Sequence, residues 1–428
     1  MPGAHPPGVP VRVAIIGSGI AGLGAARVLT AAHDVTVFEA APRPGGHVYT
    51  VQADGHAVDM GFIVCNRERY PLFFGLLGEL GIATRPTTMS FSVALPHDDL
   101  EWGSASLGAM FADRRRLFDR RHWRFLGEVL AFLLRGQRDL DGGAVGLLTL
   151  DDYVAARGLS RELRDRFLVP LAAALWSLAP DRCGAFPAET YLRFLDQHGM
   201  LRPIRPLAWR TVEGGSQRYV DALLAALAPR RFTLRLATPV TAIHRNATGV
   251  TVLAGGPTGG ERFERVVLAT HADTALALLA EPSPDERRVL GAFQYSINHT
   301  VLHRDPSFLP RRAAAHASWN YVADPDTAQV AVTYSMTRLQ GLPADPPFLV
   351  TLNPRRPPAH ALHTAAFTHP QFDRAALAAQ GELTRIGRGA RTYYAGAHAR
   401  FGFHEDGLRS GVTAASNLLA DAQREGAA

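Results

Sequence analysis

The sequence predicts an α/β fold, α+β overall, in which one domain is assembled from separated segments and a second, mixed helical and β domain fills the intervals. An apolar run, Val13–Ile16, leads directly into the turn Gly17-Ser18-Gly19-Ile20-Ala21-Gly22, and a second run, Val35–Phe38, ends on Glu39. The strand–helix alternation weakens after about residue 90 and returns further along. We therefore assign residues 11–90, 206–283 and 389–424 to a Rossmann-like domain, and 91–205 and 284–388 to the second domain.

The first turn has the G-x-G-x-x-G pattern of a dinucleotide-binding βαβ unit. Gly17 allows the tight turn, Gly19 lets a pyrophosphate approach the backbone, and Gly22 lets the helix pack closely on the strand. The free N–H groups and the dipole of the helix N-terminus favour negative charge there. Glu39 follows at the spacing where an acid accepts hydrogen bonds from ribose hydroxyls. The motif alone would be weak evidence, but strand, turn, helix, strand and acid occur here in order.

The remaining elements follow from local patterns. The first domain continues with a short strand and Gly turn at 58–64, then a helix at 70–80 ended by Gly81. Residues 91–205 have mostly helical apolar spacing and are rich in arginine. The α/β pattern that returns comprises a helix at 217–227, strands at 232–236, 240–244, 250–254 and 263–270, and a helix at 272–279. Short strands follow over 284–388, then a strand at 392–395 and a final helix starting near Gly407.

Composition limits the chemistry. All 45 basic residues are arginine, which excludes a Schiff-base lysine, a phosphate-loop lysine and a lysine general base. Two cysteines, Cys65 and Cys183, give neither a disulfide framework nor a metal cluster, so we expect no metal. No apolar run reaches the ~18 residues of a membrane-spanning helix, and the N-terminus lacks the pattern of a secretory signal. We expect a cytoplasmic protein.

The segment Glu39-Ala40-Ala41-Pro42-Arg43-Pro44-Gly45-Gly46 resembles the FAD-dependent amine oxidase superfamily, in which E-x-x-x-R-x-G-G follows the second strand. Residues 59–62 resemble the family segment that lies along the flavin, and residues 394–411 resemble its last flavin-binding motif. The resemblance implies non-covalent FAD, held by the Gly-rich turn and by Glu39, Ala40, Arg43, Gly45, Gly46, His47, Gly61, Phe62, Ile63, Val240, Gly396, Asp406, Gly407 and Leu408. No cysteine lies near the last motif to form a cysteinyl-flavin bond.

Within the superfamily, the string Gly402-Phe403-His404-Glu405-Asp406-Gly407 is similar to a bacterial branch of predicted NAD/FAD-binding proteins. That branch is similar to the N-terminal oxidase-like domain of plant cyclopropane fatty acid synthases. The resemblance implies an FAD-dependent oxidoreductase of dehydrogenase, desaturase or oxidase type, which transfers hydride between an apolar substrate, such as a lipid acyl chain, and FAD. Two alternatives are a flavin amine oxidase, against which the missing lysine argues, and a non-catalytic flavin-bearing partner of a lipid methyltransferase.

His404 is the candidate catalytic residue, because the last motif of the family places it near the flavin ring. His299, Trp319, Asn320 and His398 are further candidates for the substrate face. A histidine in such a position is often a structural residue instead.

The segment Arg114–Leu133 combines clustered arginines with helical apolar spacing. It predicts either a helix that contacts an anionic membrane surface or a solvated arginine-rich face over an ordinary core helix. Nucleic-acid binding is not expected, because no recognition module accompanies the basic residues.

Overall fold

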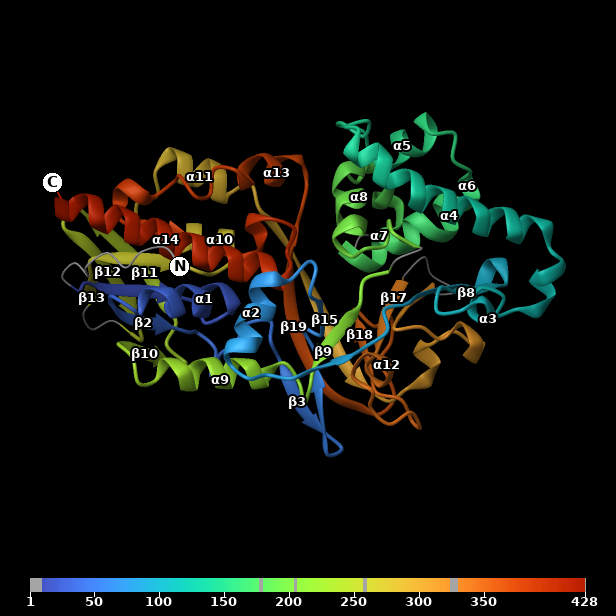
Figure 1. Ribbon diagram of the computed structural model, residues 1–428, viewed down its shortest axis with the longest axis horizontal. Helices are drawn as coiled ribbons and strands as arrows, with labels where there is room; N and C mark the ends of the chain where they lie inside the picture. Colours follow the sequence, from blue (N-terminus) through green and yellow to red (C-terminus); the bar gives the residue numbers. More distant parts are fainter. Residues whose placement is uncertain (1–9, 177–179, 204–205, 257–259, 324–329, 428) are drawn as a thin grey trace.

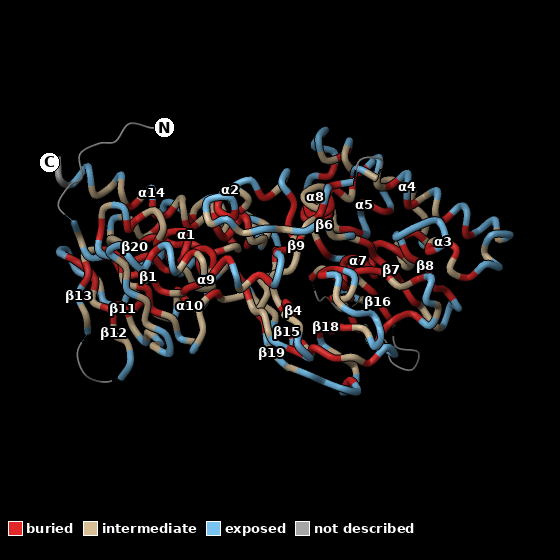
Figure 2. Tube along the Cα trace, turned by 60° about the horizontal axis from the view of Figure 1, so that its bottom comes forward, coloured by how far each residue is buried: buried red, intermediate tan, exposed pale blue. Residues whose placement is uncertain are grey.

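The computed structural model describes residues 10–176, 180–203, 206–256, 260–323 and 330–427 (Figure 1). Residues 1–9, which the sequence predicts to be a disordered lead-in, lie outside the described residues. One end of the long axis carries a parallel sheet between helices, and the other end carries a larger mixed sheet beneath a group of helices. Buried residues run through both ends (Figure 2).

The first sheet has five parallel strands in the order β10-β2-β1-β14-β20. Its strands are β10 (Phe232–Arg235), β2 (Asp34–Phe38), β1 (Arg12–Ile16), β14 (Arg265–Leu268) and β20 (Thr392–Tyr394). Three stretches of sequence, 12–38, 232–268 and 392–394, thus supply one sheet. The apolar runs that predicted β1, β2 and β14 are continuous because a parallel sheet is buried on both faces. The predicted α/β fold is confirmed.

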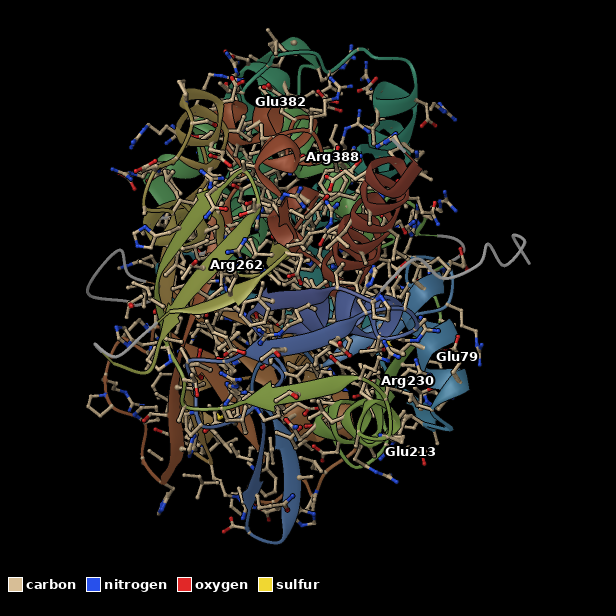
Figure 3. All side chains as sticks on the ribbon, turned by 90° about the vertical axis from the view of Figure 1, so that its left-hand side faces the viewer. Glu79, Glu213, Arg230, Arg262, Glu382 and Arg388 are labelled. Atoms are coloured by element: carbon tan, nitrogen blue, oxygen red, sulfur yellow. The ribbon has the colours of Figure 1, made fainter. Side chains whose placement is uncertain are left out.

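Alternate residues of each strand face two different layers of this end. One layer contains α1 (Ile20–Leu29), α2 (Pro71–Glu79), α9 (Gln217–Leu227) and α14 (His404–Ala427). The other contains α10 (Ala272–Leu278), α11 (Pro284–Leu290), α13 (Arg374–Gln380) and the antiparallel strands β11 (Val240–Asn246), β12 (Gly249–Ala254) and β13 (Glu261–Phe263). Figure 3 looks onto this end of the molecule.

The second sheet has seven strands in the order β19-β15-β18-β17-β16-β7-β8. Its strands are β19 (Ala361–Gln371), β15 (Gln294–His303), β18 (Leu349–Leu352), β17 (Val330–Ser335), β16 (Trp319–Ala323), β7 (Phe91–Leu95) and β8 (Leu100–Gly103). Its helices are α3 (Leu107–Met110), α4 (Arg120–Asp141), α5 (Leu150–Ala156), α6 (Arg161–Leu163), α7 (Val169–Trp176), α8 (Ala188–Gln197) and α12 (Met336–Gln340). Helices α4 to α8 share a core with β7, β16 and β17.

Two small sheets join the ends of the molecule. They are the hairpin β3 (Thr50–Ala53) with β4 (His56–Asp59), and the group β5 (Val64–Asn66), β9 (Trp209–Val212) and β6 (Thr84–Pro86). No helix in the described ranges combines the length and apolar character needed to cross a bilayer.

Three local predictions are corrected. The strand predicted at 58–64 is two strands, because the chain changes its partner from β3 to β9 across Gly61. Residues 91–205 begin with strands β7 and β8 rather than with helix. The last helix begins at His404, because the Asp406 carboxylate accepts the N–H groups of Phe401 (3.2 Å) and Phe403 (3.1 Å) and so closes the preceding loop.

Candidate functional site

The Gly-rich turn between β1 and α1 is crowded on its protein side and open on the other. Gly17 has φ 106°, and a Cβ there would lie 2.7 Å from the carbonyl oxygen of Ala269. A Cβ on Gly22 would overlap the carbonyl oxygen of Gly17. A Cβ on Gly19 would meet no described atom within 4 Å, and Gly19 caps α1 without a side-chain hydrogen bond. The unpaired N–H groups of the first helical turn, Ile20 and Ala21 included, thus suit an anion such as a pyrophosphate.

Glu39 holds this turn in place. Its Oε2 accepts hydrogen bonds from the N–H (2.9 Å) and hydroxyl (2.7 Å) of Ser18, and its Oε1 accepts the N–H of Ala41 (2.9 Å). Val240 begins β11 two residues after Thr238, whose N–H donates to the Glu39 carbonyl (2.8 Å). Glu39, Ala40 and Val240, which the sequence predicts to hold the cofactor, therefore meet beside the turn.

Arg43 fixes the backbone of the next predicted residues. Its guanidinium lies over the Tyr49 ring (3.9 Å) and donates to the carbonyls of Val48 (2.9 Å) and Gly46 (3.0 Å). The N–H of Gly45 donates to the Ser18 carbonyl (3.1 Å). Arg43 thus fixes the backbone at Gly46 and Val48, and the Gly45 N–H joins this segment to the first turn.

The two other predicted segments meet the same region. The N–H of Phe62 donates to the His47 carbonyl (3.0 Å), and a Cβ on Gly61 would overlap that oxygen. At the start of α14, a Cβ on Gly407 would lie 2.8 Å from Ile20 of α1. Leu408 lies beside Gly24 of α1, and the Gly396 N–H donates to the Ser410 hydroxyl (2.9 Å). Ile63 follows Phe62 directly in the chain. The fold thus assembles the predicted FAD-binding residues around one place.

Five histidines from four stretches of the sequence extend this place toward the second sheet: His47, His271, His369, His398 and His404. We call them the histidine wall. The ring centroids of His47 lie 5.8 Å from those of both His271 and His369. His271 stacks on Tyr295 (4.4 Å), whose ring lies 6.5 Å from His398. His404 stacks on Phe62 (3.9 Å).

Burial lowers the pKa of every histidine in the wall, to about 3 for His47, His398 and His404. Neighbouring histidines lower these pKa values further, because two cations cannot lie close together without repulsion. The Asp273 carboxylate, which raises the pKa of His271, lies exposed at the start of α10. The wall is therefore neutral at pH 7.

Hydrogen bonds orient three rings of the wall. His47 Nε2 donates to the Thr368 carbonyl (3.0 Å), so the Nδ1 of this neutral ring carries no proton. His369 Nδ1 accepts from the Asn298 amide (2.9 Å), whose own carbonyl accepts from Asn353 (2.9 Å). His404 Nε2 bonds the Tyr219 hydroxyl (2.6 Å), which leaves Nδ1 available. The catalytic role of His404 stays a prediction.

Three predicted substrate-face residues, His299, Asn320 and Trp319, do not join the wall. His299 is exposed, because β15 alternates and it is the neighbouring Asn298 that points inward. Asn320 makes all four of its side-chain hydrogen bonds to Ser92, Ala317 and Thr333, so none remains for a substrate. Trp319 packs against Tyr334 (5.4 Å).

Sequence reasoning missed His271, His369 and Asn298 as members of this site. His271 follows β14 and precedes α10, which is where α/β sheets place functional side chains, so this signal was present in the sequence. No local pattern marks His369, since it reaches the wall through the pairing of β19 with β15. Among the described residues, no group of three or more histidine, cysteine or acidic side chains is arranged to hold a metal ion.

Comparison with known proteins gives the family. Residues 20–301, about two thirds of the chain, match the family described as flavin containing amine oxidoreductase. The chain belongs to this family. The predicted assignment to an FAD-dependent oxidoreductase family is therefore confirmed, and so is the predicted cofactor, FAD. The open face at Gly19 and the uncapped start of α1 fit the pyrophosphate of that cofactor.

Individual relatives differ in what they are named for. A protein of Mycobacterium tuberculosis, named among the flavin-containing monoamine oxidases, is 31% identical over 263 residues, which are 56% of this chain and 53% of that protein. A protein of Synechococcus elongatus that is named as a zeta-carotene desaturase is 27% identical to this chain. The match covers 64% of this chain and 59% of that protein. The chain spans about half the length of the first of these curated relatives.

Solved structures show the same fold. Cyclohexylamine oxidase from Brevibacterium oxydans matches with a TM-score of 0.71 and 19% identity, over 97% of this chain and all of that one. A fatty acid isomerase from P. acnes that produces CLA matches with a TM-score of 0.68 and 18% identity, over 94% and 97% of the two chains.

Proposed function

We propose that this protein is an FAD-dependent oxidoreductase that transfers hydride between FAD and an uncharged, apolar substrate, with a lipid acyl chain as the substrate class. The observation that carries the proposal is the histidine wall, which is neutral and is continued by the rings of Phe62, Phe367 and Tyr295. When bound, FAD supplies a ring system that exchanges a hydride with a substrate carbon.

The chain's own residues position the cofactor and exclude water. The start of α1 would bind the pyrophosphate, and Glu39, which fixes the turn, would offer an acceptor to the ribose. The start of α14 places the positive end of a long helix beside Gly407, where it stabilises negative charge. In the tautomer whose Nε2 donates to the Tyr219 hydroxyl, the Nδ1 of His404 would accept a proton, and Phe62 stacks on the ring.

An amine substrate is less well matched by these residues. A protonated amine is bound by carboxylates or by an aromatic cage next to them. The carboxylates of Glu405 and Asp406 are already bonded to backbone N–H groups of Leu72, Phe73, Phe401 and Phe403. The sequence resemblance to oxidase-like domains of lipid-modifying enzymes supports the acyl chain as substrate.

Anaerobic reduction of the bound flavin tests the proposal. The holoprotein is mixed with a long-chain unsaturated fatty acid, with its phospholipid ester, and with putrescine and cyclohexylamine, and the loss of oxidised-flavin absorbance is followed. Reduction by a lipid and not by the amines supports the proposal. Rapid reduction by an amine supports the amine oxidase alternative. Stable flavin with no reduction by any of them supports the alternative of a flavin-bearing partner of a lipid methyltransferase.

A test of the role of His404 requires a variant that keeps its hydrogen bond with Tyr219. His404→Gln can still bond the Tyr219 hydroxyl, so FAD should stay bound. Loss of a proton acceptor should slow flavin reduction by about a hundredfold. An unchanged reduction rate with the first substrate found would assign His404 to packing alone.

A further inference from the structure

Helix α4 presents an apolar stripe to solvent. Trp123 (53% exposed), Leu130 (47%) and Leu134 (39%) form the stripe, and Phe118 (90%) lies exposed just before the helix begins. Positions 123, 127, 130 and 134 are three or four residues apart, so they share one helix face. The opposite face of α4, with Phe125, Val129 and Phe132, is already packed in the core. The stripe is therefore a second apolar face without a partner in the described chain.

Exposed arginines lie near the two ends of this stripe. Arg114, Arg120, Arg121 and Arg138 are exposed, and none of them makes an ion pair within the described residues. The nearby acids are turned elsewhere: Glu128 bonds Ser160, and Asp139 bonds Tyr153 and Arg157. We call the apolar stripe and these four arginines the α4 face.

The residues that precede α4 hold the exposed Trp123 ring in place. The Trp123 indole N–H donates to the Leu117 carbonyl (2.9 Å), and its ring lies 4.7 Å from that of Phe111. His122 bonds the Met110 carbonyl (2.8 Å). In Figure 1, α4 lies below α5 and extends to the right-hand end of the molecule, the end farthest from the nucleotide-binding sheet. The exposed rings are thus presented by a folded support.

We propose that the α4 face docks on the surface of an anionic phospholipid bilayer. Trp and Phe rings favour the membrane–water boundary, and an exposed helix with an apolar stripe beside arginines matches that boundary in both polarity and charge. Unpaired arginines favour this occupant over a second copy of the chain, because two copies of the face would bring like charges together. The proposal does not depend on which substrate the flavin oxidises.

Packing connects the α4 face to the flavin site. Gly136 of α4 lies against Leu192 of α8, where an added Cβ would be 3.0 Å from the leucine side chain. On the same helix, the Phe194 ring lies 5.3 Å from that of Phe403, the residue before His404. A bilayer on the α4 face would thus be separated from the start of α14 by two helices, α4 and α8.

Vesicle co-sedimentation of the holoprotein tests the docking. Vesicles of phosphatidylglycerol and phosphatidylcholine are compared with vesicles of phosphatidylcholine alone, at low and high salt. The protein should bind the anionic vesicles at low salt, bind the neutral ones at least tenfold less, and be released by salt. Changing Arg114, Arg120, Arg121 and Arg138 to Gln should lower the partition coefficient by roughly a hundredfold or more. The double change Phe118→Ser and Leu130→Ser should also lower it.

The matched control changes four exposed arginines at the other end of the molecule to Gln: Arg230, Arg231, Arg262 and Arg287 (Figure 3 labels two of them). This variant has the same net charge as the test variant and should bind vesicles as the wild type does. Flavin content and melting temperature report whether each variant is folded. Equal binding to neutral vesicles, or equal loss in both quadruple variants, would overturn the proposal. The proposal would also be overturned if the wild-type protein does not bind vesicles but forms a dimer, and if the substitutions on the α4 face dissociate that dimer.

Discussion

The two sides of the cofactor site are built in opposite ways. On the nucleotide side, glycines create a surface from bare backbone, and Gly22 and Gly61 have no room for a side chain. On the substrate side, the wall is made of rings that come from four separate stretches of the chain. The first side depends on the local order of residues along the chain, whereas the second depends on how distant strands pair. Substitutions should therefore have different consequences on the two sides.

The largest expected effect is from Gly22→Ala. Its Cβ would overlap the Gly17 carbonyl, so α1 must move away from β1, and we expect loss of FAD together with a loss of several kcal/mol in the free energy of unfolding. Gly78→Ala in α2 is the control, because a Cβ there meets no atom within 4 Å. Flavin absorbance and thermal melting measure both effects, and a Gly22→Ala protein with normal FAD would contradict the crowding.

Gly19→Val should separate binding from folding. No described atom lies within 4 Å of its added Cβ, so the apoprotein should melt like the wild-type apoprotein. The same side chain would occupy the approach to the first helical turn, so FAD affinity should be lost. Titration of the apoprotein with FAD checks this. Normal affinity would show that the pyrophosphate lies elsewhere.

Lowering the pH below 6.5 should reduce the free energy of unfolding, because the histidines of the wall are buried without charge. Burial lowers the pKa of His47, His398 and His404 to about 3, from 6.5, so between these values the unfolded chain binds protons that the folded chain does not. Their stabilising contribution is complete above pH 6.5 and is lost as the pH falls, by about 2 kcal/mol for each histidine at pH 5. Burial raises the pKa of Asp59 and Asp406 to about 6, and these carboxyls offset part of the loss.

The melting temperature between pH 7 and pH 5 measures this dependence. His398→Gln should make the decrease shallower, whereas His244→Gln, which changes an exposed histidine on β11, should leave it unchanged. A melting temperature that stays constant or rises toward pH 5 would contradict the neutral wall.

The smallest expected effect is from Glu39→Ala. The change removes the acceptor for Ser18 and Ala41 and a ribose hydrogen bond, so FAD affinity should fall by about 1–3 kcal/mol. Glu79→Ala is the control, since Glu79 makes a half-exposed ion pair with Arg27 and such pairs contribute little. Titration calorimetry with FAD compares the two variants, and equal affinities would remove Glu39 from the binding site.

The same difference between local patterns and long-range pairing explains which parts of the fold and of the site the sequence predicts. The turn at Gly17–Gly22, the helix at 217–227 and the strand ending before Glu39 are local patterns, and the structure places each of them within a residue or two. The seven-stranded sheet was not predicted as one unit, because its strands β7 and β16 are more than two hundred residues apart and pair in parallel. His369 was missed for the same reason.

The contact between α1 and α14 sets an order of events during synthesis. Leu408 fills the space beside Gly24, and Gly407 lies against Ile20, so the first helix completes its packing only against the last one. A ribosome releases α14 long after it has made β1 and α1, and β20 at the sheet edge also comes late. The nascent nucleotide-binding half must therefore wait, with one helix layer incomplete, until the final helix emerges. Capture of the cofactor would then follow the docking of α14 on α1.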